Sequence, residues 1–240
     1  MPAVFVHGVP ETHRIWSPVR ALLSRNDTVA VDLPGFSVPV PDGFTMDKES
    51  YVEWLIGEVE AIGEPVDIVG HDWGALLTIR LASIRPDLVR TWAVGGGAID
   101  PAYVWHDMAR MWQTPGVGEQ VLQAMTGDAL KAALTGAGIQ EADAADVAKY
   151  IDDTMKAAIL PLYRSAVNVG EEWGPDLPKM PKAGLLIWGA DDPYMQVKHA
   201  EYMAGVTGAR LVSLAGTGHW WPLAKPAEVA KLLEAHWASV

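Results

Sequence analysis

Short runs of consecutive apolar residues recur along the chain and alternate with stretches in which apolar residues are spaced as on one face of a helix. Uninterrupted apolar runs are typical of strands buried on both faces, whereas spacings of three or four residues indicate amphipathic helices. This alternation predicts an α/β fold with a mostly parallel sheet covered by helices. The predicted strands lie within residues 2–8, 27–36, 65–72, 89–99, 184–192 and 209–219, and the predicted helices between or after them lie within residues 16–25, 46–63, 75–86 and 226–238.

The strand pattern is interrupted between about residue 100 and residue 173. Only helical patterns occur there, at residues 119–125, 128–136 and 141–163. A proline-rich stretch, GPDLPKMPKA, follows and predicts a linker back to the sheet. We therefore expect a core in two parts, residues 1–99 and 179–240, separated by a helical cap or lid at residues 100–178.

Composition narrows the class of protein. Of 240 residues, 50% are hydrophobic and 20% are charged, which fits one domain with a sizeable core. No cysteine is present, so disulfides, thiolate metal sites and cysteine nucleophiles are excluded. The formal net charge of −12 argues against nucleic acid or an anionic membrane as a partner.

The beginning of the chain and its apolar runs bear on location. No apolar run approaches the roughly 20 residues that span a bilayer, and no basic segment with a cleavage site precedes the first predicted strand. We therefore expect a cytoplasmic protein with no membrane partner, present as a monomer or homodimer.

The stretch GHDWG, residues 70–74, lies between a predicted strand and a predicted helix. Small residues on either side of the central position permit a tight, strained strand-to-helix turn that exposes the central side chain. In the commonest form of this turn the central residue is serine, but here it is Asp72. We therefore expect Asp72 to be a nucleophile.

Two further motifs provide partners for Asp72. WGADDP ends a late predicted strand, and Asp192, which is followed by proline, is well placed to orient a histidine; Asp191 is the second choice. GTGHWWP places His219 after the last predicted strand, where it can serve as a general base.

A fourth motif, HGVPETHRIW, follows the first predicted strand. Because this strand should lie beside the one that ends at Asp72, the backbone N–H groups of Val9 and Trp73 can form an oxyanion hole. We interpret His7 as a structural brace for this loop, and we expect the His71 side chain to point away from the substrate.

The order HGxP, GxDxG, GxxDP and GH, with a helical insertion after the fourth strand, resembles the α/β-hydrolase fold. More narrowly, it resembles the branch with an aspartate nucleophile, which contains epoxide hydrolases, haloalkane dehalogenases and fluoroacetate dehalogenases. The resemblance covers nearly the whole chain. One departure is that members usually have two further strands before the HGxP strand.

A carboxylate suits substitution at an sp³ carbon, where it displaces a halide or opens an epoxide and leaves an alkyl ester. Asp72 needs no base for this attack, so His219, held by Asp192, is free to activate the water that cleaves the ester.

The resemblance leaves the leaving group open, with an epoxide as the first choice. Epoxide hydrolases usually carry two cap tyrosines that donate protons to the epoxide oxygen, and ILPLYRSA resembles the segment that holds one of them, Tyr163. The other tyrosine aligns with Met111, so Tyr103, Tyr150 or His106 would have to replace it.

Haloalkane dehalogenation is the alternative. Trp73 matches the tryptophan that binds halide in those enzymes, but Val9 stands where many of them have asparagine. A second indole donor would then come from the cap, with Trp105, Trp112 and Trp173 as candidates. Fluoroacetate dehalogenases have arginine where this chain has Trp73, so that substrate is disfavoured.

A hypothesis from another functional class is a non-catalytic receptor on the same fold. The complete set of Asp72, Asp192 and His219 counts against it, because a receptor does not need all three. We expect a small apolar organic substrate and water as reactants, with no cofactor. The sequence has no metal-ligand cluster and no phosphate-binding glycine loop, because VGGGAI lacks the necessary spacing.

Overall fold

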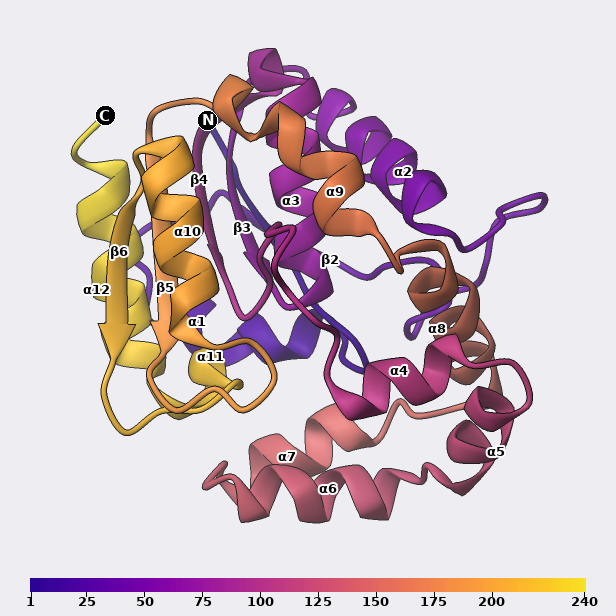
Figure 1. Ribbon diagram of the computed structural model, residues 1–240. Coiled ribbons are helices and arrows are strands. Elements are labelled where there is room, and N and C mark those ends of the chain that lie inside the picture. The colour runs from indigo at the N-terminus through magenta and orange to yellow at the C-terminus, as the bar shows by residue number, and fades with distance from the viewer.

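The computed structural model describes residues 1–240 and contains one sheet of six parallel strands. The apolar runs of the sequence form these strands, as predicted, although the strands are shorter than the runs. Figure 1 shows the sheet running through the centre of the molecule, with helices on both sides. The strands are β1 Ala3–Val6, β2 Thr28–Val31, β3 Val66–His71, β4 Val89–Gly95, β5 Gly184–Gly189 and β6 Arg210–Leu214.

The strand order is β2-β1-β3-β4-β5-β6, so the chain winds outward from β1 to β2 and then returns to β3 on the other side of β1. Such a reversal leaves a crevice at the carboxyl ends of the two strands on either side of it, which is where ligands bind in open α/β sheets. Here the crevice lies between β1 and β3. The loop after β1 begins at His7, and the residue after β3 is Asp72.

Helices cover both faces of the sheet, and alternate residues of a strand point to opposite faces. In β1, Val4 and Val6 belong to the larger apolar core, whereas Ala3 and Phe5 belong to the smaller one. The larger core includes residues of α2, α3 and α10, and the smaller one includes residues of α1, α11 and α12. The helices on these faces are α1 Ser17–Arg20, α2 Lys48–Glu60, α3 Trp73–Ile84, α10 Val197–Thr207, α11 Trp221–Ala224 and α12 Pro226–Trp237, with 3-10 turns η1 His13–Trp16 and η2 Pro86–Leu88.

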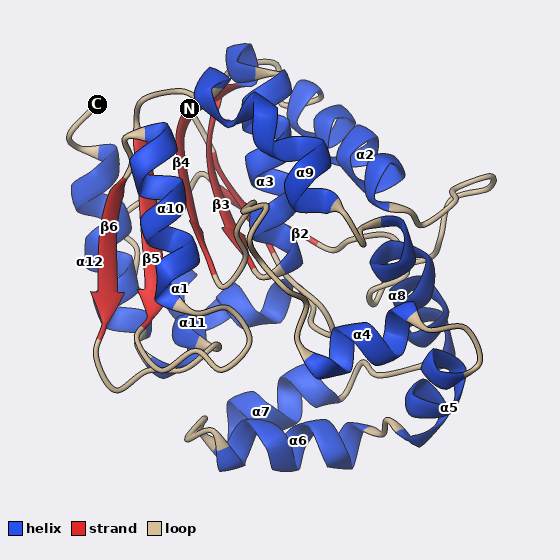
Figure 2. Cartoon of the chain, in the orientation of Figure 1, coloured by secondary structure: helices blue, strands red, loops and turns tan.

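The segment in which the strand pattern is interrupted forms helices, and these lie beyond the carboxyl ends of the strands, as Figure 2 shows for α4 to α7. Residues of α4, α5 and α8 pack into the larger core. The 3-10 segment η3 instead packs against α3 and α10. The limits predicted for the cap, residues 100 and 178, stay a prediction. The elements in this part are α4 Asp107–Gln113, α5 Val117–Ala124, α6 Gly127–Gly136, α7 Glu141–Ala148, α8 Asp153–Ser165, α9 Val169–Trp173 and η3 Gly174–Lys179.

Two predicted elements differ from the structure. The single helix predicted at residues 141–163 is two helices, α7 and α8, because the Asp152 carboxylate accepts a hydrogen bond from the Met155 N–H at 2.8 Å and starts a new helix. The predicted linker contains η3, since prolines are tolerated in the first turn of a helical segment.

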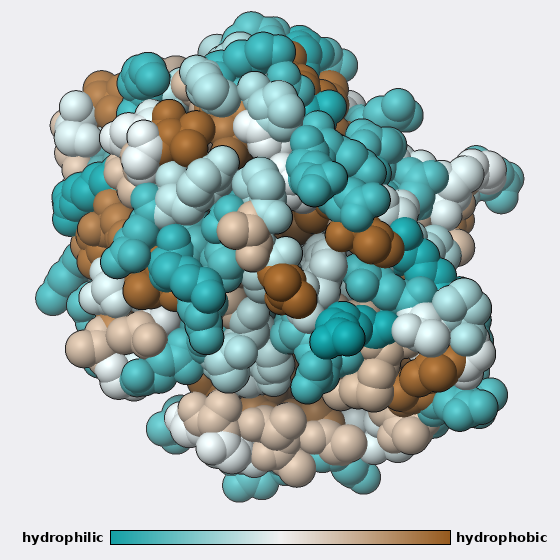
Figure 3. All heavy atoms as spheres, viewed as in Figure 1, coloured by the Kyte–Doolittle hydropathy of each residue, from teal (hydrophilic) through white to brown (hydrophobic).

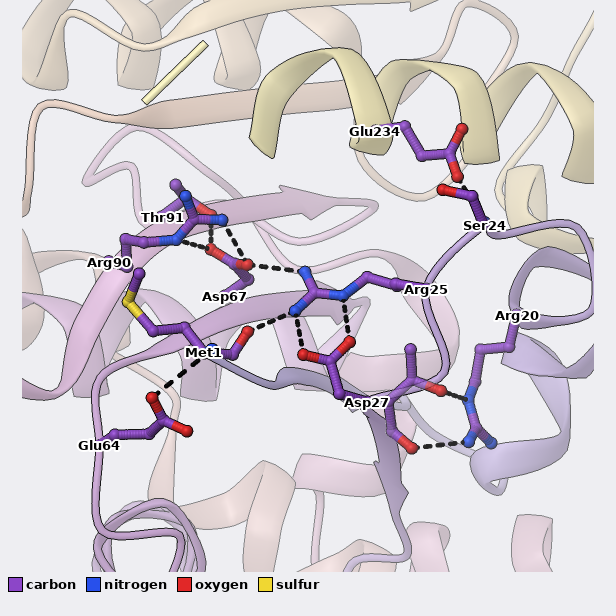
Figure 4. A network of polar contacts seen from close by, with 11 residues as sticks. Met1, Arg20, Ser24, Arg25, Asp27, Glu64, Asp67, Arg90, Thr91 and Glu234 are labelled. Atoms are coloured by element: carbon purple, nitrogen blue, oxygen red, sulfur yellow. Dashed lines mark hydrogen bonds and ion pairs between the residues drawn. The ribbon is translucent and has the colours of Figure 1, made fainter. Parts of the chain in front are cut away.

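A buried carboxylate joins several chain segments at the amino ends of the strands (Figure 4). Asp67 in β3 is fully buried, and its oxygens accept hydrogen bonds from Arg25 at 2.8 Å, from Arg90 at 2.6 and 2.8 Å and from the Thr91 hydroxyl at 2.7 Å. Every lone pair of this carboxylate faces a donor. The cluster therefore fixes three segments together at the amino ends of the strands, the end of the sheet opposite Asp72.

Hydrophilic side chains cover most of the face seen in Figure 3, and paler residues gather over α6 and α7. These two helices are rich in alanine, with the sequences GDALKAALTG and EADAADVA. Small side chains dominate this part of the surface for that reason. No helix is long and apolar enough to cross a membrane.

Candidate active site

Asp72 occupies the turn between β3 and α3 with φ 52° and ψ −119°. Positive φ is uncommon for a residue with a Cβ atom, so the surrounding structure must hold this conformation. The turn is tight because a Cβ atom on Gly74 would lie 2.2 Å from the Val6 carbonyl oxygen, and one on Gly70 would lie 2.3 Å from the Gly74 oxygen. The glycines therefore permit the close approach that exposes Asp72.

The two oxygens of the Asp72 carboxylate have different surroundings. The Val9 N–H donates a hydrogen bond of 2.7 Å to Oδ1. The Trp73 N–H is at the first position of α3, where no helical acceptor exists. Oδ2 lies 3.5 Å from His219 Nε2. Oδ1 is thus held by the backbone, and Oδ2 is the freer oxygen.

His219 lies between two carboxylates. Its Nδ1 lies 2.8 Å from Asp192 Oδ2, and the other Asp192 oxygen accepts hydrogen bonds from the Tyr194 and Met195 N–H groups at 2.9 and 3.0 Å. Asp191 is exposed, and its N–H donates to the Thr217 carbonyl oxygen. The structure therefore brings together Asp72, His219 and Asp192, and it leaves Asp191 outside this group.

The charges of these three side chains are mutually dependent. Burial by itself raises the pKa of the Asp72 carboxyl, but His219, His71 and the Val9 N–H outweigh it and hold that pKa below its ordinary value. The same balance, dominated by His219, lowers the pKa of Asp192. Burial lowers the pKa of His219, but the two carboxylates outweigh it and raise that pKa well above its ordinary value.

A second pair of buried side chains supports the loop after β1. His71 Nε2 donates to the His219 carbonyl oxygen at 3.0 Å, and His71 Nδ1 lies 3.0 Å from Glu11 Oε2. The same Glu11 oxygen accepts from the Gly8 N–H at 3.1 Å. Sequence reasoning missed Glu11; its only signal is its place directly after HGVP.

His7 holds the same loop from the other side, which fits its interpretation as a brace. Its Nδ1 donates to the Gly8 carbonyl oxygen at 2.7 Å, and its Nε2 accepts from the Leu33 N–H at 3.0 Å. Burial lowers the pKa of His7, so the ring is neutral and its two contacts fix the tautomer.

A cavity of about 530 Å³ lies between helices α4 to α6 and the site at Asp72 and His219. Most of its lining is apolar and comes from α4, α5 and α6, where small side chains such as Ala129 and Ala133 leave room. The lining residues are Val9, Pro10, Asp72, His106, Met108, Met111, Trp112, Val121, Ala124, Met125, Ala129, Leu130, Ala133, Tyr163, Tyr194, His219 and Trp220.

Tyr163 reaches this cavity from α8, and aromatic rings surround it. The ring centroids of Trp73, Trp105 and Trp112 lie 5.3, 5.5 and 4.8 Å from that of Tyr163. Burial and then the charge of Asp72 raise the pKa of the Tyr163 hydroxyl well above its ordinary value, and a contact with Trp73 opposes this rise. The hydroxyl therefore keeps its proton and is a hydrogen-bond donor.

The candidate indole donors are in different situations. The Trp105 N–H donates to the Ala166 carbonyl oxygen at 3.2 Å, and the Trp173 N–H donates to Glu49 at 3.1 Å. This corrects the expectation for both as halide donors, because an N–H already bound to the protein is not free for a ligand. The Trp73 and Trp112 N–H groups are buried without a partner.

The residues considered for the second proton donor also lie in different environments. The Tyr103 hydroxyl donates to the Tyr194 carbonyl oxygen at 3.2 Å. The Tyr150 ring lies under Arg14, 4.6 Å from its guanidinium carbon, and does not line the cavity. Met111 and His106 both line the cavity. A thioether has no proton to donate, so only His106 of these candidates can donate into the cavity.

No group of three or more histidine, aspartate or glutamate side chains is arranged to hold a metal ion.

The comparisons with curated proteins give distant relatives. A stretch of 98 residues is 30% identical to an (E)-2-((N-methylformamido)methylene)succinate hydrolase of Acinetobacter baylyi and covers 40% of this chain and 37% of that protein. Epoxide hydrolase 3 of Mus musculus is 26% identical over 97% of this chain and 69% of its own length. A haloalkane dehalogenase of Bradyrhizobium diazoefficiens is 29% identical over 50% of this chain and 44% of its own length. The match thus spans less than half the length of two of these relatives.

The fold agrees with solved structures. A haloalkane dehalogenase DbeA loop variant from Bradyrhizobium elkanii superposes with a TM-score of 0.77 at 22% identity, over 99% of this chain and 90% of that one. Residues 3–232 match the family described as the alpha/beta hydrolase family, which is almost the whole chain. The six-stranded parallel sheet flanked by helices is the expected α/β-hydrolase fold. The chain belongs to the alpha/beta hydrolase family.

Proposed function

We propose that this protein opens epoxides by hydrolysis through a covalent ester on Asp72, with a small apolar organic epoxide as substrate. The observation that carries the proposal is the Asp72 carboxylate. Its Oδ1 is held by the Val9 N–H, and the side chain lines a mostly apolar cavity that Tyr163 also lines. An aspartate at this turn is suited to attack on carbon rather than to ordinary ester hydrolysis.

In the first step, Asp72 Oδ2 attacks a ring carbon of the epoxide. A new C–O bond forms, the bond from that carbon to the ring oxygen breaks, and its electron pair moves to the ring oxygen. The Tyr163 hydroxyl donates to this oxygen and transfers its proton. The products are an alkyl ester on Asp72 and a tyrosinate.

In the second step, water attacks the Asp72 carbonyl carbon while His219 Nε2 takes a proton from it. The developing negative charge falls on Oδ1, which the Val9 and Trp73 N–H groups stabilise. His219 has by then given its own proton to the tyrosinate, so it can accept one from water. The ester bond breaks, the leaving alkoxide takes the proton of the hydroxyl group added to the Asp72 carbon, and the diol leaves while His219 keeps the proton taken from water. The sum of both steps is one epoxide and one water giving one vicinal diol.

The relationship to epoxide hydrolase 3 supports this proposal because it extends over 97% of the chain. The cap of residues 100–178 is part of the proposal, since it supplies Tyr163 and the apolar wall of the cavity. The exclusion of water by such a wall strengthens the hydrogen bonds that act on the developing charge.

The experiment that tests the proposal uses His219→Gln. This variant should form the ester with styrene oxide but fail to hydrolyse it, so mass spectrometry of the intact protein should show one added substrate mass, located on Asp72 after digestion. The matched control is the double variant with Asp72→Ala, which should show no added mass. Absence of the adduct in a folded His219→Gln protein contradicts the proposal.

A second candidate reaction is the hydrolytic release of halide from a haloalkane. The specific observation in its favour is that the Trp73 and Trp112 indole N–H groups are buried without partners, and such groups are suited to bind a leaving halide. The same His219→Gln variant distinguishes the two reactions. An adduct with bromohexane together with bromide release, and none with styrene oxide, would assign the protein to this second reaction.

A further inference from the structure

The cap supplies one tyrosine to the cavity, Tyr163, and the position expected for its companion is Met111. The opening of a strained ring by a carboxylate benefits from two donors on the leaving oxygen, because each removes part of the developing charge. We propose that His106, at the start of α4, is the second donor and that it acts through its Nε2–H group. This inference rests on the proposed epoxide chemistry.

The structure fixes the position and the tautomer of the His106 ring. His106 lines the same cavity as Asp72 and Tyr163. It is also the N-cap of α4, where its Nδ1 accepts a hydrogen bond from the Ala109 N–H at 3.3 Å. A neutral imidazole that accepts at Nδ1 must carry its proton at Nε2. The helix cap therefore leaves Nε2 as a donor.

The charge state of the ring agrees with this role. Burial lowers the pKa of His106, and the nearby positive charge of His219 acts in the same direction, whereas Asp72 and Asp192 oppose the change. The ring is then neutral at neutral pH, and its hydrogen bond to the protein is the one that Nδ1 accepts from the Ala109 N–H. A donor without a partner in a mostly apolar cavity is free for the oxygen of a ligand.

Tyr194 is another side chain of the cavity that carries a hydrogen-bond donor. Tyr194 lies on the core side, where its ring packs edge-on against His219 at 5.1 Å between centroids. Its ring also lies 5.0 Å from that of His106. Tyr163 and His106 belong to the cap, whereas Tyr194 lies beside the base, which favours His106 as the donor opposite Asp72.

The chemistry assigned to His106 leaves its proton in place. When Asp72 Oδ2 attacks carbon and the ring C–O bond breaks, the electron pair goes to the ring oxygen. That oxygen accepts one hydrogen bond from the Tyr163 hydroxyl, which transfers its proton, and another from His106 Nε2–H, which does not. His106 therefore touches the reacting oxygen and begins and ends the step as a neutral ring.

Two substitutions separate donation from the capping of α4. His106→Asn keeps a side chain that caps a helix well but is too short to reach the ligand, whereas His106→Gln places an amide N–H about where Nε2–H lies and weakens the cap. Both are made in the His219→Gln protein, and the rate of ester formation on Asp72 with styrene oxide is measured from the growth of the adduct mass. Tyr194→Phe in the same background tests whether the Tyr194 hydroxyl is the donor instead.

If His106 is the donor, His106→Asn slows ester formation by about 100-fold, the usual effect of losing one donor to a developing oxyanion, and His106→Gln restores most of the rate. If His106 only caps α4, the order is reversed, because Asn keeps the cap, and the inference is wrong. A loss in Tyr194→Phe that matches the one in His106→Asn also overturns it. No adduct in the parent His219→Gln protein overturns the proposed function itself, whereas equal rates in all four proteins overturn only the role of His106.

Discussion

Gly8→Ala should damage the candidate site, because the added methyl group would meet the Asp72 side chain itself. A Cβ atom at Gly8 would lie 2.4 Å from Asp72 Cβ and 2.5 Å from Asp72 Oδ1. Ordinary van der Waals contact begins about 1 Å further away. Asp72 Cβ is attached to the strained turn and cannot rotate out of the way, so Asp72 or the loop after β1 must shift by about that amount.

A displacement of about 1 Å in a reacting group costs about 100-fold in rate, which corresponds to about 2.7 kcal/mol in the activation free energy. Overpacking of this kind also lowers the free energy of unfolding by roughly 1–3 kcal/mol. We therefore expect Gly8→Ala to fold with reduced stability and to form the Asp72 ester with styrene oxide about 100 times more slowly in the His219→Gln background.

Gly57→Ala is the matched control, because it makes the same chemical change inside α2, where a Cβ atom meets nothing within 4 Å. It should leave ester formation unchanged and raise the free energy of unfolding by roughly 0.5–1 kcal/mol, since alanine is a better helix former than glycine. Mass spectrometry gives the rate of ester formation, and urea titration gives the stability. The reasoning fails if folded Gly8→Ala protein forms the ester as fast as the Gly57→Ala control.

Three further outcomes are expected. Asp192→Asn should slow ester hydrolysis by roughly 10⁴-fold while Asp72 is still alkylated at nearly the parent rate, so rapid-quench mass spectrometry should show the ester accumulating; equal slowing of both steps would contradict this. Asp67→Asn should lower the free energy of unfolding in urea by about 3 kcal/mol, because it removes the buried partner of two arginines, and it should leave turnover by the folded protein unchanged; lost turnover at full stability would count against it. The stability difference between the parent protein and His219→Gln should be largest between about pH 4 and pH 6.5, and a difference that does not vary with pH would refute the assigned charges. Asp72 and Asp192, whose pKa values are lowered in the folded protein, stabilise it above their unfolded pKa of about 4, and this stabilisation is lost as the pH falls through their folded pKa. His219, whose pKa is raised, stabilises the folded protein fully below pH 6.5, and this stabilisation is lost as the pH rises through its folded pKa.

Local sequence patterns were sufficient for the sheet and for the turn at Asp72. Strands such as β3 and β5 are continuous apolar runs. GHDWG has glycine at both ends because the Val6 backbone leaves no room for a Cβ atom at Gly74, and the Gly74 backbone leaves none at Gly70. These signals depend on neighbours in the sequence, so they can be read without the fold. The choice of Asp192 over Asp191 as the residue that contacts His219 also agrees with the structure.

The cap was less accessible to sequence reasoning because its side chains are positioned by contacts between distant segments. Nothing local indicates that the Trp105 N–H is bound by the Ala166 carbonyl oxygen, 61 residues away. The role of Glu11 depends on His71, which is 60 residues away. Helix α10 was not predicted, although Gly208 ends it in the left-handed conformation typical of a helix end.

The position of His219 between two carboxylates sets the timing of the proposed reaction. Before alkylation, both negative charges hold the pKa of His219 well above its ordinary value, so the ring is protonated and cannot act as a base. Alkylation turns the Asp72 carboxylate, whose Oδ2 lies 3.5 Å from His219 Nε2, into a neutral ester. Burial then lowers the pKa of the ring against one remaining charge instead of two, and in the proposed reaction the ring gives its proton to the tyrosinate formed in the first step. In the proposed reaction, the charge of Asp72 therefore prevents His219 from acting as a base until an ester is present to be cleaved.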